Sequence, residues 1–213
     1  MPARPRTVIT LAWWCAGIAA VGAGGAWVCA SSSCGPLRAD RAALGALHAL
    51  RSPWLDAVLG SVTWLGSVSL LAPLAAFASW RFARTGRPRA AVFAAGSLVG
   101  AFALVHLGKF LFERPRPALF DVAGLMPGDP SFPSAHSAQI AAFAIAIALV
   151  LRSGSVWLLA ALVIGAVAFS RLYLQVHFPT DVAAGLLLGA CWALGLHALL
   201  RPESAPPGQP ETP

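Results

Sequence analysis

Six apolar stretches separated by short polar segments make up most of this chain. A transmembrane helix needs about 20 predominantly apolar residues, and each stretch reaches or approaches that length. The expected bounds are residues 8–30, 55–80, 90–112, 137–151, 155–169 and 181–200. The fourth helix can begin near Ser134 and the fifth can continue through Arg171, which lengthens the two shortest stretches. The pattern predicts an all-α, polytopic membrane protein whose six transmembrane helices form one domain over residues 1–200.

The composition indicates the same class of protein. Of the 213 residues, 58% are hydrophobic and 11% are charged, whereas soluble domains carry roughly 25% charged residues. The first apolar stretch follows basic residues, as the core of a secretory signal peptide does. It is longer than the roughly 7–15 residues of such a core, so we expect an uncleaved first helix.

The net charge of +7 does not indicate nucleic-acid binding, because the basic residues flank the apolar stretches instead of forming a basic face. With the N-terminus inside, eight of the fifteen are cytoplasmic: Arg4, Arg6, Arg81, Arg84, Arg87, Arg89, Arg152 and Arg201. The other seven are outside: Arg38, Arg41, Arg51, Lys109, Arg114, Arg116 and Arg171. Four of these seven belong to the polar segments described below. Without these four, eight basic residues lie on the cytoplasmic side and three on the outer side. This difference predicts a multi-pass protein of the cell membrane with both termini cytoplasmic.

Two segments outside the apolar stretches have their own patterns. In the outer loop, residues 31–54, Leu44, Leu47 and Leu50 recur at three-residue spacing, which favours a short helix on the membrane surface. A plain connector is the alternative. The tail, residues 201–213, is rich in proline and is expected to be disordered.

The four cysteines do not form a metal-binding pattern. They are Cys15, Cys29, Cys34 and Cys191, and none belongs to a CxxC pair, so zinc is not expected. Cys29 and Cys34 could form a disulfide if their end of the first helix faces an oxidising compartment. Free thiols are equally compatible with the sequence.

Three polar segments are expected on the outer side of the membrane. They are KFLFERPRP at residues 109–117, PSAHS at residues 133–137 and SRLYLQVHFPTD at residues 170–181. They adjoin the ends of the third, fourth, fifth and sixth apolar stretches, so they converge if these helices bundle together. Ionisable residues scattered by chance would not gather at one end of the spans.

The residues in these segments favour an anionic ligand. Lys109, Arg116 and Arg171 would repel one another unless an anion joined them, and arginine offers forked donors that suit phosphate. Ser134 resembles an N-cap, so the first-turn N–H groups of Ala135 and its neighbours also favour an anion.

Histidines complete the expected site. His136 and His177 can transfer protons near neutral pH. Asp181 lies four residues after His177 and could hydrogen-bond its ring, which would orient His177 as a nucleophile.

Together these segments resemble the signature of the type 2 phosphatidic acid phosphatase family, the membrane branch of the phosphatase–haloperoxidase superfamily. That signature is Lys, six residues and Arg-Pro; then Pro-Ser-Gly-His; then Ser-Arg, five residues, His, three residues and Asp. The matching residues are Lys109, Arg116 and Pro117; Pro133, Ser134 and His136; and Ser170, Arg171, His177 and Asp181.

One position departs from the signature, and another leaves its register open. Ala135 stands where the family usually has glycine, and we expect it to be the first helical residue, where alanine is comfortable. Arg114-Pro115 offers a rival register for the first part, and only the six-residue gap selects Arg116.

The resemblance implies a helical-bundle phosphatase core and a metal-independent hydrolysis with no cofactor. His177 would attack phosphorus to form a phosphohistidine, and His136 would protonate the leaving group. Lys109, Arg116, Ser134, Ala135 and Arg171 would hold the phosphate oxygens, with Asp181 behind His177.

A site at the membrane implies a lipid phosphate or a polyprenyl pyrophosphate as substrate, and its outer position slightly favours the latter. Two alternatives remain: phosphoryl transfer to an alcohol by the same site, or a lipid-binding or transport protein without catalysis.

Overall fold

Helices form throughout the apolar stretches. The computed structural model describes residues 5–30, 34–122 and 126–203. Within these ranges it contains eight α-helices, one short 3₁₀ helix and no strand. The elements are α1 (Pro5–Val28), α2 (Arg38–His48), α3 (Pro53–Val62), η1 (Thr63–Gly66), α4 (Val68–Arg84), α5 (Pro88–Phe112), α6 (Ala135–Leu151), α7 (Gly154–Tyr173) and α8 (Pro179–Leu200).

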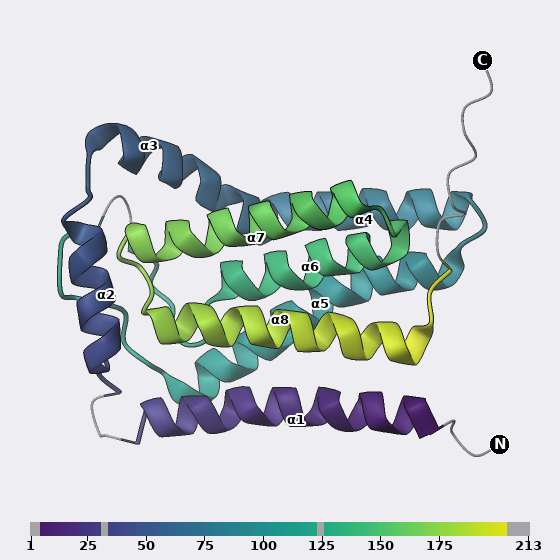
Figure 1. Cartoon of the computed structure of the whole chain (residues 1–213), viewed down its shortest axis with the longest axis horizontal. Helices are drawn as coiled ribbons and strands as arrows, with labels where there is room; N and C mark the ends of the chain where they lie inside the picture. The colour runs from purple at the N-terminus through teal and green to yellow at the C-terminus, as the bar shows by residue number, and fades with distance from the viewer. Residues whose placement is uncertain (1–4, 31–33, 123–125, 204–213) are drawn as a thin grey trace.

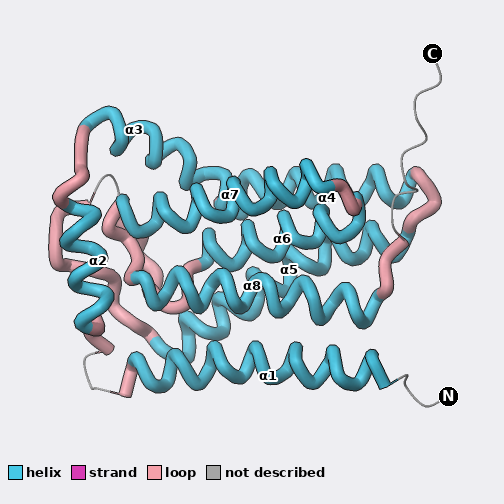
Figure 2. The backbone as a smooth tube through the Cα atoms, in the orientation of Figure 1, coloured by secondary structure: helices cyan, strands magenta, loops and turns pink. Residues whose placement is uncertain are grey.

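The long helices lie side by side, and α2 lies across one end of the bundle (Figure 1). At this α2 end, α1, α5 and α7 finish while α3, α6 and α8 begin, and the tube view in Figure 2 shows the loops that gather there. Helix α6 contacts α5, α7 and α8 and so occupies the centre of the bundle. The three polar segments therefore lie at one end of the molecule.

The second apolar stretch is not the single helix that the sequence predicted. It forms α3 and η1 and then, after a bend of 43°, α4. Ser67 interrupts the helix with extended backbone and caps α4 by accepting a hydrogen bond from the Ser69 N–H at 3.2 Å. At the bend, Gly66 lies so close to α6 that a Cβ there would be 3.0 Å from the Cβ of His136. The break brings η1 against the start of α6.

Helices α6 and α8 approach closely because glycines line the contact. A Cβ at Gly189 would lie 2.2 Å from the carbonyl oxygen of Ala138, and one at Gly185 would lie 2.5 Å from the carbonyl oxygen of Ser134. Small residues allow such close backbone approach between membrane helices. The contact fixes the start of α8 against the start of α6.

The outer surface of the bundle is suited to a lipid environment. Phe110, Leu158 and Leu162 are each more than half exposed, and a soluble protein rarely exposes apolar patches of this extent. In the described chain, α5, α7 and α8 are long and apolar enough to cross a membrane, and the bent pair from Pro53 to Arg84 makes a fourth span if it counts as one. The other apolar helices, Trp14–Val28 within α1 and Ala135–Leu151, are shorter. The chain is a multi-pass membrane protein.

A disulfide joins Cys29, just after α1, to Cys34, which precedes α2. The sequence left this pairing open. The bond lies at the α2 end, where it ties the first helix to the loop that carries α2. Most of the proline-rich tail, from residue 204 onward, lies outside the described residues.

We predict that Gly189→Ala lowers the thermal stability of the protein in detergent, because the added Cβ must push α8 away from the Ala138 carbonyl. Gly165→Ala is the matched control, since nothing lies within 4 Å of a Cβ at that position of α7. Alanine favours a helix over glycine by about 1 kcal/mol, so the control should be neutral or stabilising. Equal unfolding temperatures for both variants would contradict the close contact.

Candidate active site

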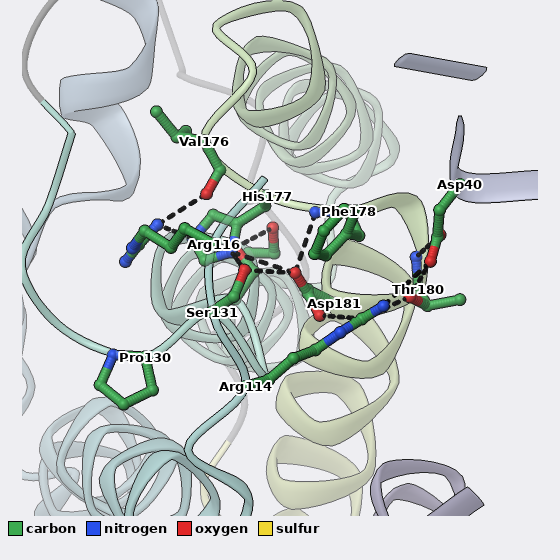
Figure 3. A network of polar contacts seen from close by, with 12 residues as sticks. Asp40, Arg114, Arg116, Pro130, Ser131, Val176, His177, Phe178, Thr180 and Asp181 are labelled. Atoms are coloured by element: carbon green, nitrogen blue, oxygen red, sulfur yellow. Dashed lines mark hydrogen bonds and ion pairs between the residues drawn. The ribbon is translucent and has the colours of Figure 1, made fainter. Parts of the chain in front are cut away.

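Side chains and main chain of the first and third polar segments meet in one network (Figure 3), and the second segment contacts the third through its main chain. The Arg116 Nη1 atom donates to the Val176 carbonyl at 2.7 Å and lies 3.1 Å from His177 Nε2. The Ser134 N–H donates to the Asp181 carbonyl at 3.0 Å. The first and second segments thus each contact the third.

The first segment leaves the bundle because of its prolines. Helix α5 ends at Phe112, and Glu113 follows it with a left-handed φ of 44°, as is common at helix C-termini. Pro115 and Pro117 disfavour helical backbone in the residues before them. Arg114 and Arg116 therefore leave α5 on a non-helical segment and reach different partners.

His177 is 1% exposed and lies in the short turn between α7 and α8. Gln175 turns the chain with a left-handed φ of 61°, and its side-chain amide donates to the Leu44 carbonyl of α2 at 3.1 Å. Phe178 and Pro179 then begin α8, and Asp181 accepts the Phe178 N–H at 2.9 Å. The imidazole and the carboxylate are therefore both fixed at the start of α8.

Ser131 bridges His177 and Asp181, which corrects the direct hydrogen bond that the sequence suggested. His177 Nδ1 lies 3.6 Å from Asp181 Oδ2, which is too long for a hydrogen bond. The Ser131 hydroxyl donates to Asp181 Oδ2 at 2.5 Å and lies 3.2 Å from His177 Nδ1. Since that hydroxyl proton goes to Asp181, Nδ1 carries a proton and donates it to Ser131. Nε2 is then the nitrogen with the free lone pair, and it faces Arg116.

Arg114 is fully buried behind this carboxylate. It donates to Asp181 Oδ1 at 2.5 Å, to Asp40 Oδ2 at 3.0 Å and to Thr180 Oγ1 at 2.7 Å. Its remaining donors bond the carbonyls of Cys34 and Gly35, each at 3.2 Å. A buried charge is tolerated only when it is paired and hydrogen-bonded. Arg114 thus holds the α2 loop and the start of α8 together, while Arg116 is the arginine that contacts His177.

The second segment has the helical form that the sequence predicted. Ser134 occupies the N-cap position and Ala135 is the first residue of α6, so the alanine needs no left-handed backbone. Ser134 is buried, and its hydroxyl accepts from the Ser137 hydroxyl at 3.1 Å instead of capping the helix. His136 lies in the same first turn, next to Gly66.

Arg171 lies at the end of α7 and is 5% exposed. Its Nη1 donates to Thr63 Oγ1 of η1 at 2.6 Å. Its buried Nε has no hydrogen-bond partner among the residues that the structure describes. Buried donors are nearly always paired in proteins, so this N–H remains able to bind an anion.

Lys109 and Arg116 share one carboxylate, that of Asp129. Lys109 Nζ lies 2.9 Å from Asp129 Oδ2, and Arg116 Nη2 lies 2.7 Å from Oδ1. The Lys109 ammonium also donates to the Pro130 carbonyl. The sequence assigned no role to Asp129, but its carboxylate pairs with both cations.

Positive charge surrounds His177. Burial, followed by the charges of Arg116, Arg171 and Lys109, holds the pKa of His177 well below its usual value of 6.5. His177 is therefore neutral at physiological pH. Burial alone would raise the pKa of Asp129, but its ion pairs with Lys109 and Arg116 outweigh this and lower the pKa far below its usual range. Asp129 is therefore a carboxylate at physiological pH.

Three further residues of the network had no clear signal in the sequence. Ser131 lies in a loop and does not belong to the signature, and Asp40 lies 74 positions from its partner Arg114. Asp129 is one of several acids in loops. Among the described residues, no group of three or more His, Cys, Asp and Glu side chains could hold a metal ion.

The chain is similar to known membrane phosphatases. A model of the PAP2 superfamily matches residues 90–204, which include all three polar segments. Phosphatidylglycerophosphatase B of Bacillus subtilis is 34% identical over 71% of this chain and 78% of that protein. An undecaprenyl-diphosphatase of Sulfolobus acidocaldarius is 33% identical over 44% of this chain and 47% of that protein. The crystal structure of a transmembrane PAP2-type phosphatidylglycerolphosphate phosphatase from Bacillus subtilis matches with a TM-score of 0.68 and 25% identity, over 92% of this chain and 94% of that one.

We predict that Arg114→Met strongly destabilises the protein, because it leaves the carboxylates of Asp40 and Asp181 buried without their cation. Removing one partner of a buried ion pair costs roughly 3–5 kcal/mol, and thermal unfolding in detergent measures the loss. Arg41→Met is the control, since Arg41 is exposed on the same helix as Asp40. The network has no structural role if both variants unfold at the temperature of the unmodified protein.

Proposed function

The chain belongs to the PAP2 superfamily, and on that premise we propose that it hydrolyses a lipid phosphate or a polyprenyl pyrophosphate at the α2 end of the bundle. The observation that carries the proposal is the position of His177 Nε2. This nitrogen has its lone pair directed at the Arg116 guanidinium, 3.1 Å away, within a group of buried cations. An imidazole nitrogen surrounded by phosphate-binding groups is suited to attack phosphorus.

The first chemical step forms a phosphohistidine. The Nε2 lone pair of His177 bonds to phosphorus as the bond from phosphorus to the leaving oxygen breaks. His136, protonated once the anionic phosphate is bound beside it, donates a proton to that oxygen. The imidazolium that His177 becomes is stabilised through Nδ1–H, Ser131 and the Asp181 carboxylate, which Arg114 holds in place.

The second step releases phosphate. His136 now takes a proton from a water molecule whose oxygen attacks phosphorus, and the bond from phosphorus to Nε2 breaks. His177 returns to its neutral form, which its low pKa favours. General acid–base catalysis of this kind is typically worth about 10²–10⁴-fold in rate.

The cations would bind the equatorial oxygens, where negative charge spreads in the transition state. Lys109 and Arg116 offer the donors that now hold Asp129, and Arg171 offers its unpaired Nε. Ser134 and the N–H of Ala135 at the start of α6 add uncharged donors. Fixed cations do the neutralising in this scheme, so we propose that no metal ion is required.

An apolar groove supports a lipid substrate. Its volume is about 260 Å³, and it lies between α4, α6 and α7, with Leu70, Phe143 and Val163 among its lining residues. Leu65 of η1 is also part of the lining, and the adjacent Gly66 packs against His136. A hydrocarbon chain in this groove would extend from the site toward the lipid-facing part of the bundle.

We propose six transmembrane spans with the site on the extracytoplasmic side. In this arrangement α1, the bent pair α3–α4, and α5 to α8 each cross the membrane. The basic residues outside the site favour cytoplasmic termini. The Cys29–Cys34 disulfide supports the same orientation, because it lies at the site's end of the bundle and disulfides persist in oxidising compartments.

We predict that His177→Ala abolishes phosphate release from lipid phosphates and polyprenyl pyrophosphates by purified protein in detergent, while the thermal stability is retained. His106→Ala is the control, because the His106 ring is exposed on α5 and bonds the Phe102 carbonyl of its own helix at 2.8 Å. The assays contain a chelator. Full activity in His177→Ala would refute the nucleophile, and a requirement for added magnesium would refute the metal-free scheme.

A further inference from the structure

The Asp129 carboxylate is bound as a phosphate would be. One oxygen is held by Lys109 and the other by Arg116, at 2.9 Å and 2.7 Å. Two oxygens of a phosphoryl group have a similar spacing and take the same donors. The same guanidinium lies against His177 Nε2. The carboxylate therefore sits on two of the cations to which the proposed function assigns the substrate's phosphate.

We propose that Asp129 is a built-in competitor for the phosphate site, and that a substrate must displace its carboxylate from Lys109 and Arg116. This inference rests on the proposed function and concerns the regulation of the same site.

The surrounding main chain allows the carboxylate to leave without unfolding the loop. Three bonds that do not involve the carboxylate hold this segment. Arg116 Nε donates to the Asp129 carbonyl at 2.8 Å, Lys109 donates to the Pro130 carbonyl, and the Ser131 N–H donates to the Arg114 carbonyl at 2.7 Å. A change of side-chain rotamer is then sufficient to free both cations.

Exposure also distinguishes the three side chains. That of Asp129 is 48% exposed, whereas those of Lys109 and Arg116 are 4% and 8% exposed. The cations are fixed in the protein, and the carboxylate covers them from the solvent side. Ion pairs with an exposed partner are worth little individually, so an incoming phosphate, with more charge and more oxygens, can replace this partner.

Such a competitor raises the affinity that any anion needs in order to occupy the site. It lowers the apparent affinity of every anion by the same factor, the fraction of molecules in which the cations are free. Inorganic phosphate can offset this loss of affinity only through the contacts of its oxygens in the site. A lipid substrate gains further free energy from its apolar chain. Asp129 would thus limit inhibition by the phosphate that the reaction releases.

A purely positioning role for Asp129 predicts the opposite result. If the carboxylate only orients Lys109 and Arg116 for phosphate, its removal should weaken phosphate binding. If it competes, its removal should strengthen phosphate binding. The sign of the change in affinity therefore decides between the two roles.

The test is binding of inorganic phosphate to the full-length protein in detergent, measured by isothermal titration calorimetry without turnover. We expect Asp129→Asn to bind phosphate about tenfold more tightly than the unmodified protein, since two partly exposed ion pairs no longer compete. Asp129→Ala should show the same direction. Asp121→Asn makes the same change of charge in the same loop, and the ion pairs of Lys109 and Arg116 do not include it, so its affinity should be unchanged.

Inhibition of lipid phosphate hydrolysis by added phosphate provides a second readout, with an inhibition constant expected to fall about tenfold in Asp129→Asn. Phosphate affinity that is equal or weaker in both Asp129 variants would overturn the inference, as would an equal gain in Asp121→Asn. If the unmodified protein hydrolyses lipid phosphates in that case, the proposed function stands. If it hydrolyses none, the proposed function fails, and the calorimetric affinities still decide the role of Asp129.

Discussion

The buried pairing of Arg114 with Asp40 and Asp181 is the interaction on which the rest of the site depends. Each of these side chains is 0% exposed, and none could remain charged there without the others. The guanidinium joins the loop before α2 to the start of α8 and holds the Asp181 carboxylate in one orientation. The positions of Ser131 and His177 depend on that orientation. The serine hydroxyl donates to this carboxylate and accepts from the imidazole Nδ1. The tautomer of His177 thus depends on Arg114, which acts on it only through Asp181 and Ser131.

The other side of the His177 imidazole faces an excess of positive charge. Lys109, Arg116 and Arg171 each donate to a carbonyl or a hydroxyl, and Lys109 and Arg116 also share the Asp129 carboxylate. Their charge favours an anion. The bundle supplies one carboxylate on each side of the imidazole: Asp181 behind it, fully buried, and Asp129 in front, half exposed. The buried carboxylate stabilises the site, and the exposed one can give way to phosphate.

The sequence was sufficient to predict the helical membrane class and the meeting of the three polar segments, because both depend on local composition and spacing. Apolar runs of helical length predicted the long helices, and the resemblance selected Arg116 over Arg114 by its distance from Lys109. The N-cap serine predicted the start of α6, so Ala135 was correctly expected in helical backbone.

Features that depend on contacts between distant residues could not be predicted in this way. The bend between α3 and α4 arises where Gly66 meets α6, which the sequence of the second stretch does not reveal. The partner of Arg114 on α2 is 74 positions away. The bridge through Ser131 could be recognised only from the distance between His177 Nδ1 and Asp181 Oδ2. The spacing of four residues between His177 and Asp181 only suggested that their side chains touch. Asp129 looked like any other acid in a loop until its two cations were located.

The chemical position of the phosphoryl group on the enzyme tests the central claim most directly. Purified protein would be mixed with a lipid phosphate labelled in its phosphoryl group, quenched in base within the first turnover and digested for peptide mapping. We expect the label on His177 as the Nε2 isomer of phosphohistidine, because Nδ1 is hydrogen-bonded to Ser131. Label on Nδ1 or on another residue, or turnover without any labelled protein, would contradict the account.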